Sequence, residues 1–125
     1  MAAAVCVGVL LIGSAWIGAV AGERAATFVD QRSWSQCSGQ DNGSLDSRIG
    51  GCSALIDSSR AWKHRKLNDA LFQRGRAYHE KGDRERAIAD LTRALRSQMS
   101  ATLNRAICDF SHQAGLSIFL CGRPR

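Results

Sequence analysis

Hydrophobic residues recur at helical spacing in three separate stretches of this 125-residue chain. In the first stretch they follow one another at intervals of four, three, three and one residues, an order that places them on one face of a helix. These residues are Leu45, Ile49, Cys52, Leu55 and Ile56. Ser44 stands directly before them, where its hydroxyl group can accept a hydrogen bond from a free backbone amide of the first turn. The pattern therefore predicts a helix that begins after Ser44.

The second and third stretches predict two helices joined by a very short turn. The helix over residues 67–81 has an apolar stripe of Leu67, Leu71, Gly75 and Tyr78, with Ala70 and Ala77 beside it. The helix over residues 84–97 has one of Ala87, Ile88, Leu91, Ala94 and Leu95, again at helical spacing. Between them, Gly82 suits the left-handed conformation that closes a helix, and Asp83 can cap the next one. We therefore expect an antiparallel helical hairpin.

Small residues give this hairpin a specific likeness. Gly75 and Ala87 can let two helices approach closely, while larger side chains fill the space beyond. Residues 68–100 thereby resemble one tetratricopeptide repeat. The family's apolar, Gly, aromatic, Ala, large apolar and Ala positions are matched by Leu71, Gly75, Tyr78, Ala87, Leu91 and Ala94, with Gly82 at the turn. Arg74 stands where the family usually has Leu, and Met99 where it usually has Pro.

One such repeat cannot cover its own apolar faces, so its neighbours must do so. Residues 48–56 resemble the second helix of a degenerate preceding repeat, and residues 101–110 the opening helix of a following one. The resemblance implies an all-α fold, a short α-solenoid of antiparallel hairpins over residues 44–113. Residues 22–43 are expected to form an irregular lead-in. Residues 114–125 are expected to form an irregular tail, which is either a cap or a truncated or altered repeat.

The N-terminal residues 1–21 carry no charged side chain and have an apolar centre from Val5 to Ile12. They end in Ala19-Val20-Ala21, small residues of the kind that signal peptidase accepts. We therefore expect a cleaved signal peptide and an exported protein, periplasmic or secreted. An uncleaved membrane anchor is the alternative, because about 20 apolar residues can span a bilayer. A leader, an early cysteine pair and a repeat together look like small bacterial exported proteins of the tetratricopeptide type.

Export would make the cysteines candidates for disulfide bonds. Cys6 would leave with the signal peptide, and Cys37, Cys52, Cys108 and Cys121 would stay. Four cysteines allow three pairings. The simplest joins sequence neighbours, Cys37 with Cys52 and Cys108 with Cys121. Since Cys52 belongs to the apolar face of the first predicted helix, its bond would staple the preceding loop to that helix.

The chain is basic, with 17 Lys and Arg residues against 11 Asp and Glu and a net charge of +6. Part of this charge is concentrated in RAWKHRK, residues 60–66. A basic surface attracts nucleic acid, anionic lipid or acidic proteins without selecting among them. Trp62 is the one aromatic residue in the run, so the aromatic set that stacks on bases is missing and a solvated helix surface is the simpler interpretation. Docking of residues 60–66 on anionic lipid or nucleic acid stays an alternative function.

Catalysis has little support in the sequence. His64, His79 and His112 are scattered, and the chain has no nucleophile motif, Gly-rich phosphate loop or zinc-protease motif. Closely spaced cysteine pairs of the kind that bind zinc do not occur. We therefore expect no enzyme activity, metal, cofactor or small-molecule substrate.

The carboxylates of the hairpin have plain structural interpretations. Asp83 is predicted to cap a helix and Asp90 to lie on the surface. Glu80 with Arg84, and Asp90 with Arg86, are expected to form surface ion pairs that contribute little to stability.

Binding of a protein or peptide is the function that the resemblance implies. In the tetratricopeptide family the first helix of each repeat lines a concave groove that holds a partner. Carried over to this chain, the groove-facing residues are Asp69, Phe72, Arg76, His79 and Glu80. Phe72 would be an apolar anchor, and Arg76 would pair with an acid of the partner. In the rival interpretation Phe72 packs against a neighbouring helix and Arg76 is solvated. A cytosolic accessory subunit of an enzyme is a third possibility.

Overall fold

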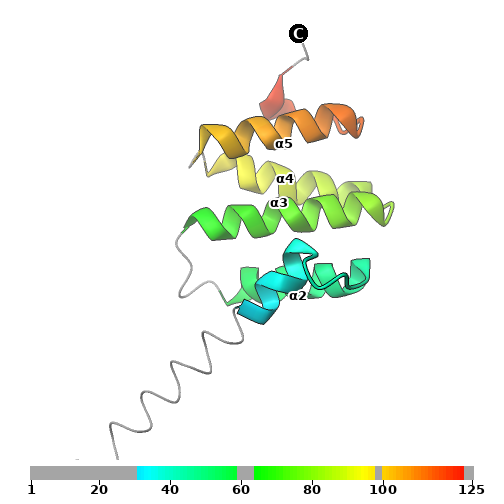
Figure 1. Cartoon of the computed structure of the whole chain (residues 1–125). Helices are drawn as coiled ribbons and strands as arrows, with labels where there is room; N and C mark the ends of the chain where they lie inside the picture. Colours follow the sequence, from blue (N-terminus) through cyan, green and yellow to red (C-terminus); the bar gives the residue numbers. More distant parts are fainter. Residues whose placement is uncertain (1–30, 59–63, 98–99, 123–125) are drawn as a thin grey trace, which may run out of the picture. The chain divides into compact units, whose positions relative to one another are not determined.

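The computed structural model describes residues 31–58, 64–97 and 100–122, and within them every regular element is helical. A helical segment at 31–38 is followed by α2 (Leu45–Asp57), α3 (His64–Glu80), α4 (Arg84–Arg96), α5 (Ala101–Gln113) and the short 3-10 helix η1 (Phe119–Cys121) (Figure 1). The predicted all-α fold is confirmed for this part of the chain. The expected signal peptide lies outside it. None of the helices in the described ranges is long and apolar enough to cross a bilayer.

The turn between α3 and α4 has the hydrogen bonds that its sequence predicts. Gly82 adopts a φ of 87°, and its N–H donates to the carbonyl of His79 at 2.9 Å while the N–H of Asp83 donates to that of Tyr78 at 2.8 Å. This pair of bonds closes a helix around a left-handed glycine. The carboxylate of Asp83 then accepts from the N–H of Arg86 at 3.1 Å and caps α4. The two helices therefore run antiparallel over a three-residue connection, residues 81–83.

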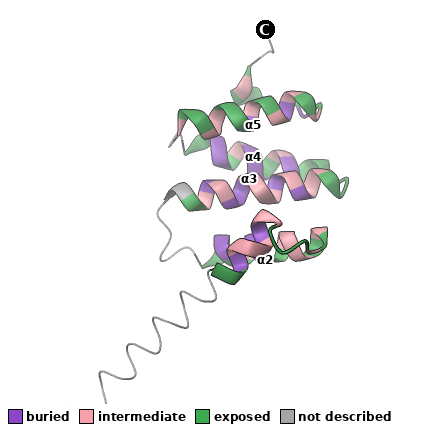
Figure 2. Ribbon diagram, viewed as in Figure 1, coloured by how far each residue is buried: buried purple, intermediate pink, exposed green. Residues whose placement is uncertain are grey.

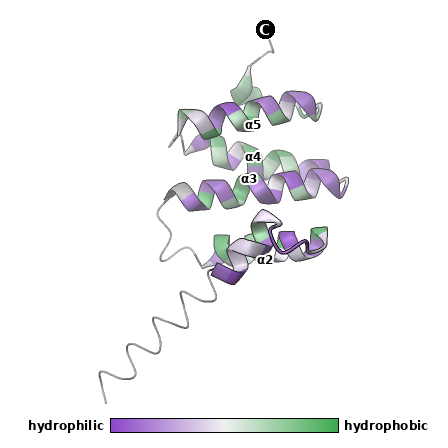
Figure 3. Cartoon of the chain, in the orientation of Figure 1, coloured by the Kyte–Doolittle hydropathy of each residue, from purple (hydrophilic) through white to green (hydrophobic). Residues whose placement is uncertain are grey.

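Buried residues run along both α3 and α4, as Figure 2 shows in purple. Leu71, Ala87, Leu91 and Ala94 are each at most 1% exposed. A Cβ atom on Gly75 would lie 2.9 Å from Cγ of Leu91, closer than real Cβ contacts. The expectation that Gly75 permits a close approach is thus confirmed, and the helices expose hydrophilic residues on their other sides (Figure 3).

The expected irregular lead-in at residues 22–43 is wrong in part, because residues 31–38 are helical. This helical segment packs on α2 at Gly51, where a Cβ atom would lie 2.6 Å from Cβ of Gln36 and 2.8 Å from the carbonyl oxygen of Ser33. The sulfur atoms of Cys37 and Cys52 are at bonding distance, as predicted. The contact depends on a glycine and a disulfide, so no apolar stripe reveals the helix in the sequence.

The ion pairs at the turn end of the hairpin differ from those expected. Glu80 accepts from Arg48 of α2 at 3.0 Å, whereas the sequence predicted a pair with Arg84. Lys81 pairs with Asp46 at the same end of α2. Arg86 pairs with Asp83 at 3.2 Å rather than with Asp90. The predictions paired residues by their spacing in the sequence. In the structure Glu80 and Lys81 find partners on α2, and Arg86 pairs with the residue that caps its own helix.

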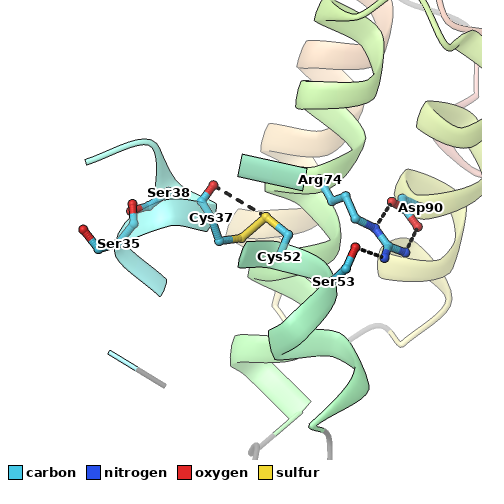
Figure 4. The surroundings of a disulfide bond; sticks show 7 residues. All are labelled: Ser35, Cys37, Ser38, Cys52, Ser53, Arg74 and Asp90. Carbon is cyan, nitrogen blue, oxygen red and sulfur yellow. Dashed lines mark hydrogen bonds and ion pairs between the residues drawn. A yellow bond between two sulfur atoms is a disulfide. The ribbon is translucent and has the colours of Figure 1, made fainter. Parts of the chain in front are cut away.

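Asp90 is the clearest correction, because it is 6% exposed and does not lie on the surface. Its two oxygens accept from Nε and Nη2 of Arg74 at 2.7 and 2.8 Å, and Nη1 of Arg74 donates to Ser53 at 3.0 Å. Figure 4 shows Arg74 reaching both partners beside the Cys37–Cys52 bond. The hydrogen bonds to Asp90 raise the pKa of Arg74 above its ordinary value, against the opposing effect of burial. Arg74 therefore ties α2, α3 and α4 together.

The tail after α5 folds back on that helix. Gly115 has a φ of 64°, and the N–H of Leu116 donates to the carbonyl of Ser111 at 2.8 Å, the same helix ending as at Gly82. Leu116 and Ile118 are 3% and 6% exposed. The sulfur atoms of Cys108 and Cys121 are at bonding distance, which confirms the second predicted pair. The expected irregular tail thus contains the ordered turn η1, and it is fastened to α5.

Candidate functional site

Three of the sequence-predicted groove residues lie together on α3. Phe72, Arg76 and His79 are separated by four and three residues, so a helix carries them on one side. All three are partly buried. They lie next to the stripe that packs on α4, whose members Leu71 and Ala70 are 1% exposed.

Phe110 of α5 completes the group. Its ring centroid is 6.1 Å from that of Phe72 and 5.6 Å from that of His79, both in edge-to-face arrangements. The guanidinium carbon of Arg76 lies 5.8 Å from the Phe72 ring centroid and 5.7 Å from the Phe110 ring centroid. We call Phe72, Arg76, His79 and Phe110 the aromatic–arginine cluster. The cluster joins α3 and α5, which are separated in the sequence by α4.

The guanidinium of Arg76 is incompletely bonded within this cluster. Its Nε atom is buried and has no hydrogen-bond partner among the described residues. A buried donor that lacks a partner costs about 1–3 kcal/mol, whereas a cation over an aromatic ring returns only about 0.5–2 kcal/mol. Arg74, two residues earlier on the same helix, differs in that its Nε bonds to Asp90. The cluster therefore holds a cation between two rings with hydrogen-bonding capacity still available.

The remaining predicted groove residues are placed differently. Asp69 is partly buried three residues before Phe72. Glu80 is exposed and takes its partner, Arg48, from α2. The rival interpretation of Phe72 is correct in so far as its ring packs against Phe110 of a neighbouring helix, but Arg76 is not simply solvated.

Phe110 is the residue that the sequence reasoning missed. The sequence contains a signal for it, because residues 101–110 resemble the opening helix of a following repeat. Opening helices of successive repeats share the groove face. Extending the groove to α5 would have brought its aromatic residue next to Phe72.

The described residues contain no group of three or more His, Cys, Asp and Glu side chains that could hold a metal ion. Residues 60–63 of the basic run lie outside the described ranges, so its role stays a prediction.

The aromatic–arginine cluster can receive a planar hydrogen-bond acceptor, such as a carboxylate, at a guanidinium flanked by rings. Comparisons with protein-family models, with curated proteins and with solved structures found no match for this chain.

Proposed function

We propose that this chain is a non-catalytic scaffold that binds a protein or peptide on the aromatic–arginine cluster. The single observation that carries the proposal is the buried Nε of Arg76 without a hydrogen-bond partner among the described residues. An acidic group of a partner would accept from this donor and from the Nη atoms at once. The phenylalanine rings would cover the apolar neighbour of that acid.

A comparison with Arg48 shows what is particular to Arg76. Arg48 also has a buried Nε without a partner, but its Nη1 donates to Glu80 at 3.0 Å. Arg76 has no ion pair within the described part of the chain. Among the residues whose burial the structure describes, a partly buried cation without a counter-ion is therefore found in the cluster alone.

The arrangement of helices supports a tetratricopeptide-type scaffold as part of the proposal. The helical segment 31–38 meets α2 closely at Gly51, and α3 meets α4 closely at Gly75. In each of these two consecutive helix pairs, a glycine on one helix leaves room for the other helix to come close. In a solenoid of such pairs, α3 and α5 would be successive groove helices, which is consistent with the contact between Phe72 and Phe110.

A peptide selection tests the proposal. Random displayed peptides would be selected on the full chain, and the affinity of the winners would be compared for wild type, Arg76→Gln and Phe72→Ala. We expect each substitution to weaken binding about tenfold or more, the value of a lost charge-assisted hydrogen bond or apolar anchor. Arg93→Gln, which removes the same charge from an exposed position on α4, is the matched control and should leave the affinity unchanged.

The same measurement separates the alternative function. Docking of the basic residues 60–66 on lipid or nucleic acid would weaken steeply as salt is added. Binding that collapses between low and physiological salt, and that is equally sensitive to Arg76→Gln and Arg93→Gln, would contradict the cluster as the binding site.

A further inference from the structure

The turn η1 exposes two large hydrophobic side chains. Phe119 is 98% exposed and Leu120 is 51% exposed, and they are the exposed large hydrophobic residues among those that the structure describes. Their neighbours Leu116 and Ile118 are buried. The segment is hydrophobic in Figure 3 and includes exposed residues in Figure 2. Such outward-facing apolar groups commonly mark an interaction site.

Several bonds hold this apolar tip, Phe119 with Leu120, in place. Cys121 is bonded to Cys108 of α5, with the Cα atoms 5.2 Å apart. The N–H of Cys121 donates to the carbonyl of Ile118 at 3.1 Å, and His112 contacts the carbonyl of Gly122 at 3.3 Å. The tip is thus presented in a fixed conformation, so that little conformational entropy remains to be lost on docking.

Positive charge lies beside Leu120 of the tip. Arg96 and Arg105 line a shallow depression together with Leu120. Asp109 is the single acidic residue of the sequence from residue 96 onward. Apolar side chains next to two arginines complement a bilayer surface, whose headgroups are anionic and whose interior is apolar.

We propose that the apolar tip docks on a membrane surface rich in anionic lipid. Phe119 and Leu120 enter the boundary between headgroups and acyl chains, and Arg96 and Arg105 lie against lipid phosphates. Two adjacent side chains on a turn offer a protein partner far less than the about 800 Å² that a stable interface buries on each side. A lipid interface accepts so small an apolar wedge, because the surrounding charges contribute as well. This site is separate from both the cluster and residues 60–66.

Depth-dependent quenching tests the proposal with a readout at the tip itself. Phe119→Trp is made in the full chain, and its additional emission is taken as the difference from the unsubstituted chain. We expect this emission to shift to shorter wavelength and to be quenched by vesicles of brominated anionic lipid, and not by brominated zwitterionic vesicles. An unchanged difference emission, whether or not the chain sediments with the vesicles, overturns the proposal.

The need for the arginines beside the tip is tested by charge-removing variants and a control variant elsewhere on the surface. Arg96→Gln with Arg105→Gln should lower partitioning into anionic vesicles at least about tenfold, since each arginine near such a surface contributes about a factor of five. Arg32→Gln, from the exposed part of the helical segment 31–38, should have a smaller effect than either arginine of the depression alone. Equal effects at the three positions would mean that only the net charge acts, and would overturn the proposal.

Discussion

Arg74 and Asp90 form a two-point ion pair across the hairpin, with N–O distances of 2.7 and 2.8 Å. Their side chains are 16% and 9% exposed, and the hydroxyl oxygen of Ser53 of α2 accepts a hydrogen bond from Nη1 of Arg74. The position of Arg74 is one that the resembled repeat usually fills with leucine. The charged pair therefore occupies space in which an apolar contact would be ordinary.

Replacing one partner of this pair should destabilise the fold strongly. Arg74→Leu leaves the Asp90 carboxylate buried without a counter-ion, which typically costs about 3–5 kcal/mol. The double variant Arg74→Leu with Asp90→Leu should recover most or all of that loss, because a packed apolar pair replaces a buried ionic one at little cost. Urea unfolding of the wild type, both single variants and the double variant gives the coupling. Additive losses would contradict a coupled pair.

The pH dependence of this pair follows from the raised pKa of Arg74. A raised pKa in the folded state means that the contribution of the charged guanidinium is fully present below the ordinary arginine pKa. It is lost only as the pH rises through the raised value. The stability difference between wild type and Arg74→Leu should therefore be constant from neutral to moderately alkaline pH, as urea titrations at several pH values can check. A difference that disappears in the mildly alkaline range would contradict the assignment.

Two glycines of the described helices should respond in opposite directions to alanine. At Gly75 the new methyl group would lie 2.9 Å from Leu91, and overpacking of this kind costs about 1–3 kcal/mol. At Gly50 of α2 no atom lies within 4 Å, so the better helix former should stabilise the protein by about 0.5–1 kcal/mol. Thermal unfolding of the two variants measures both effects. A neutral Gly75→Ala would mean that α3 and α4 are not in close contact.

The sequence was sufficient for the elements that depend on local pattern. Ser44 and Asp83 cap helices as predicted, the glycine turn is at Gly82, and neighbouring cysteines pair. The caps and the turn are determined by residues within a few positions of one another, and the cysteine pairs follow from the order of the cysteines in the chain. The features that were missed depend on which side chains of different helices meet.

Asp90 shows why the spacing of residues in the sequence does not predict such contacts. Its partner lies 16 residues away in the sequence, on the other helix of the hairpin, whereas the expected partner Arg86 lies one helical turn away. A clue was present in Arg74, a charged residue at a usually apolar position, since a buried cation requires a buried acid. Phe110 was missed for a related reason, because its contact with Phe72 appears only once α5 is placed beside α3.

The two disulfides should differ in their reactivity towards a thiol reductant. Cys37 and Cys52 are both 0% exposed, whereas Cys108 and Cys121 are only partly buried. Thiol exchange requires access to sulfur. Under native conditions, limited reduction with trapping by an alkylating reagent should label Cys108 and Cys121 first, as peptide mass spectrometry can show. Labelling of Cys37 and Cys52 at the same or an earlier stage would contradict this order.

The predicted leader gives a mass prediction that is independent of the fold. Intact protein from its native host should lack about the first 21 residues, because signal peptidase accepts small residues such as Ala19-Val20-Ala21. It should also resist alkylation until it is reduced. Recovery of the full-length chain with free thiols would contradict export and both disulfide bonds together.

The partner-binding role of Arg76 is most directly measured by its Nε–H resonance in a nitrogen-15 spectrum of the full chain. On addition of a selected acidic peptide, we expect the Arg76 resonance to move and its exchange with water to slow, because the buried donor gains an acceptor. The Nε–H resonance of Arg74, already bonded to Asp90 at 2.7 Å, should stay in place. A peptide that binds while the Arg76 resonance is unchanged would show that the aromatic–arginine cluster is not the binding site.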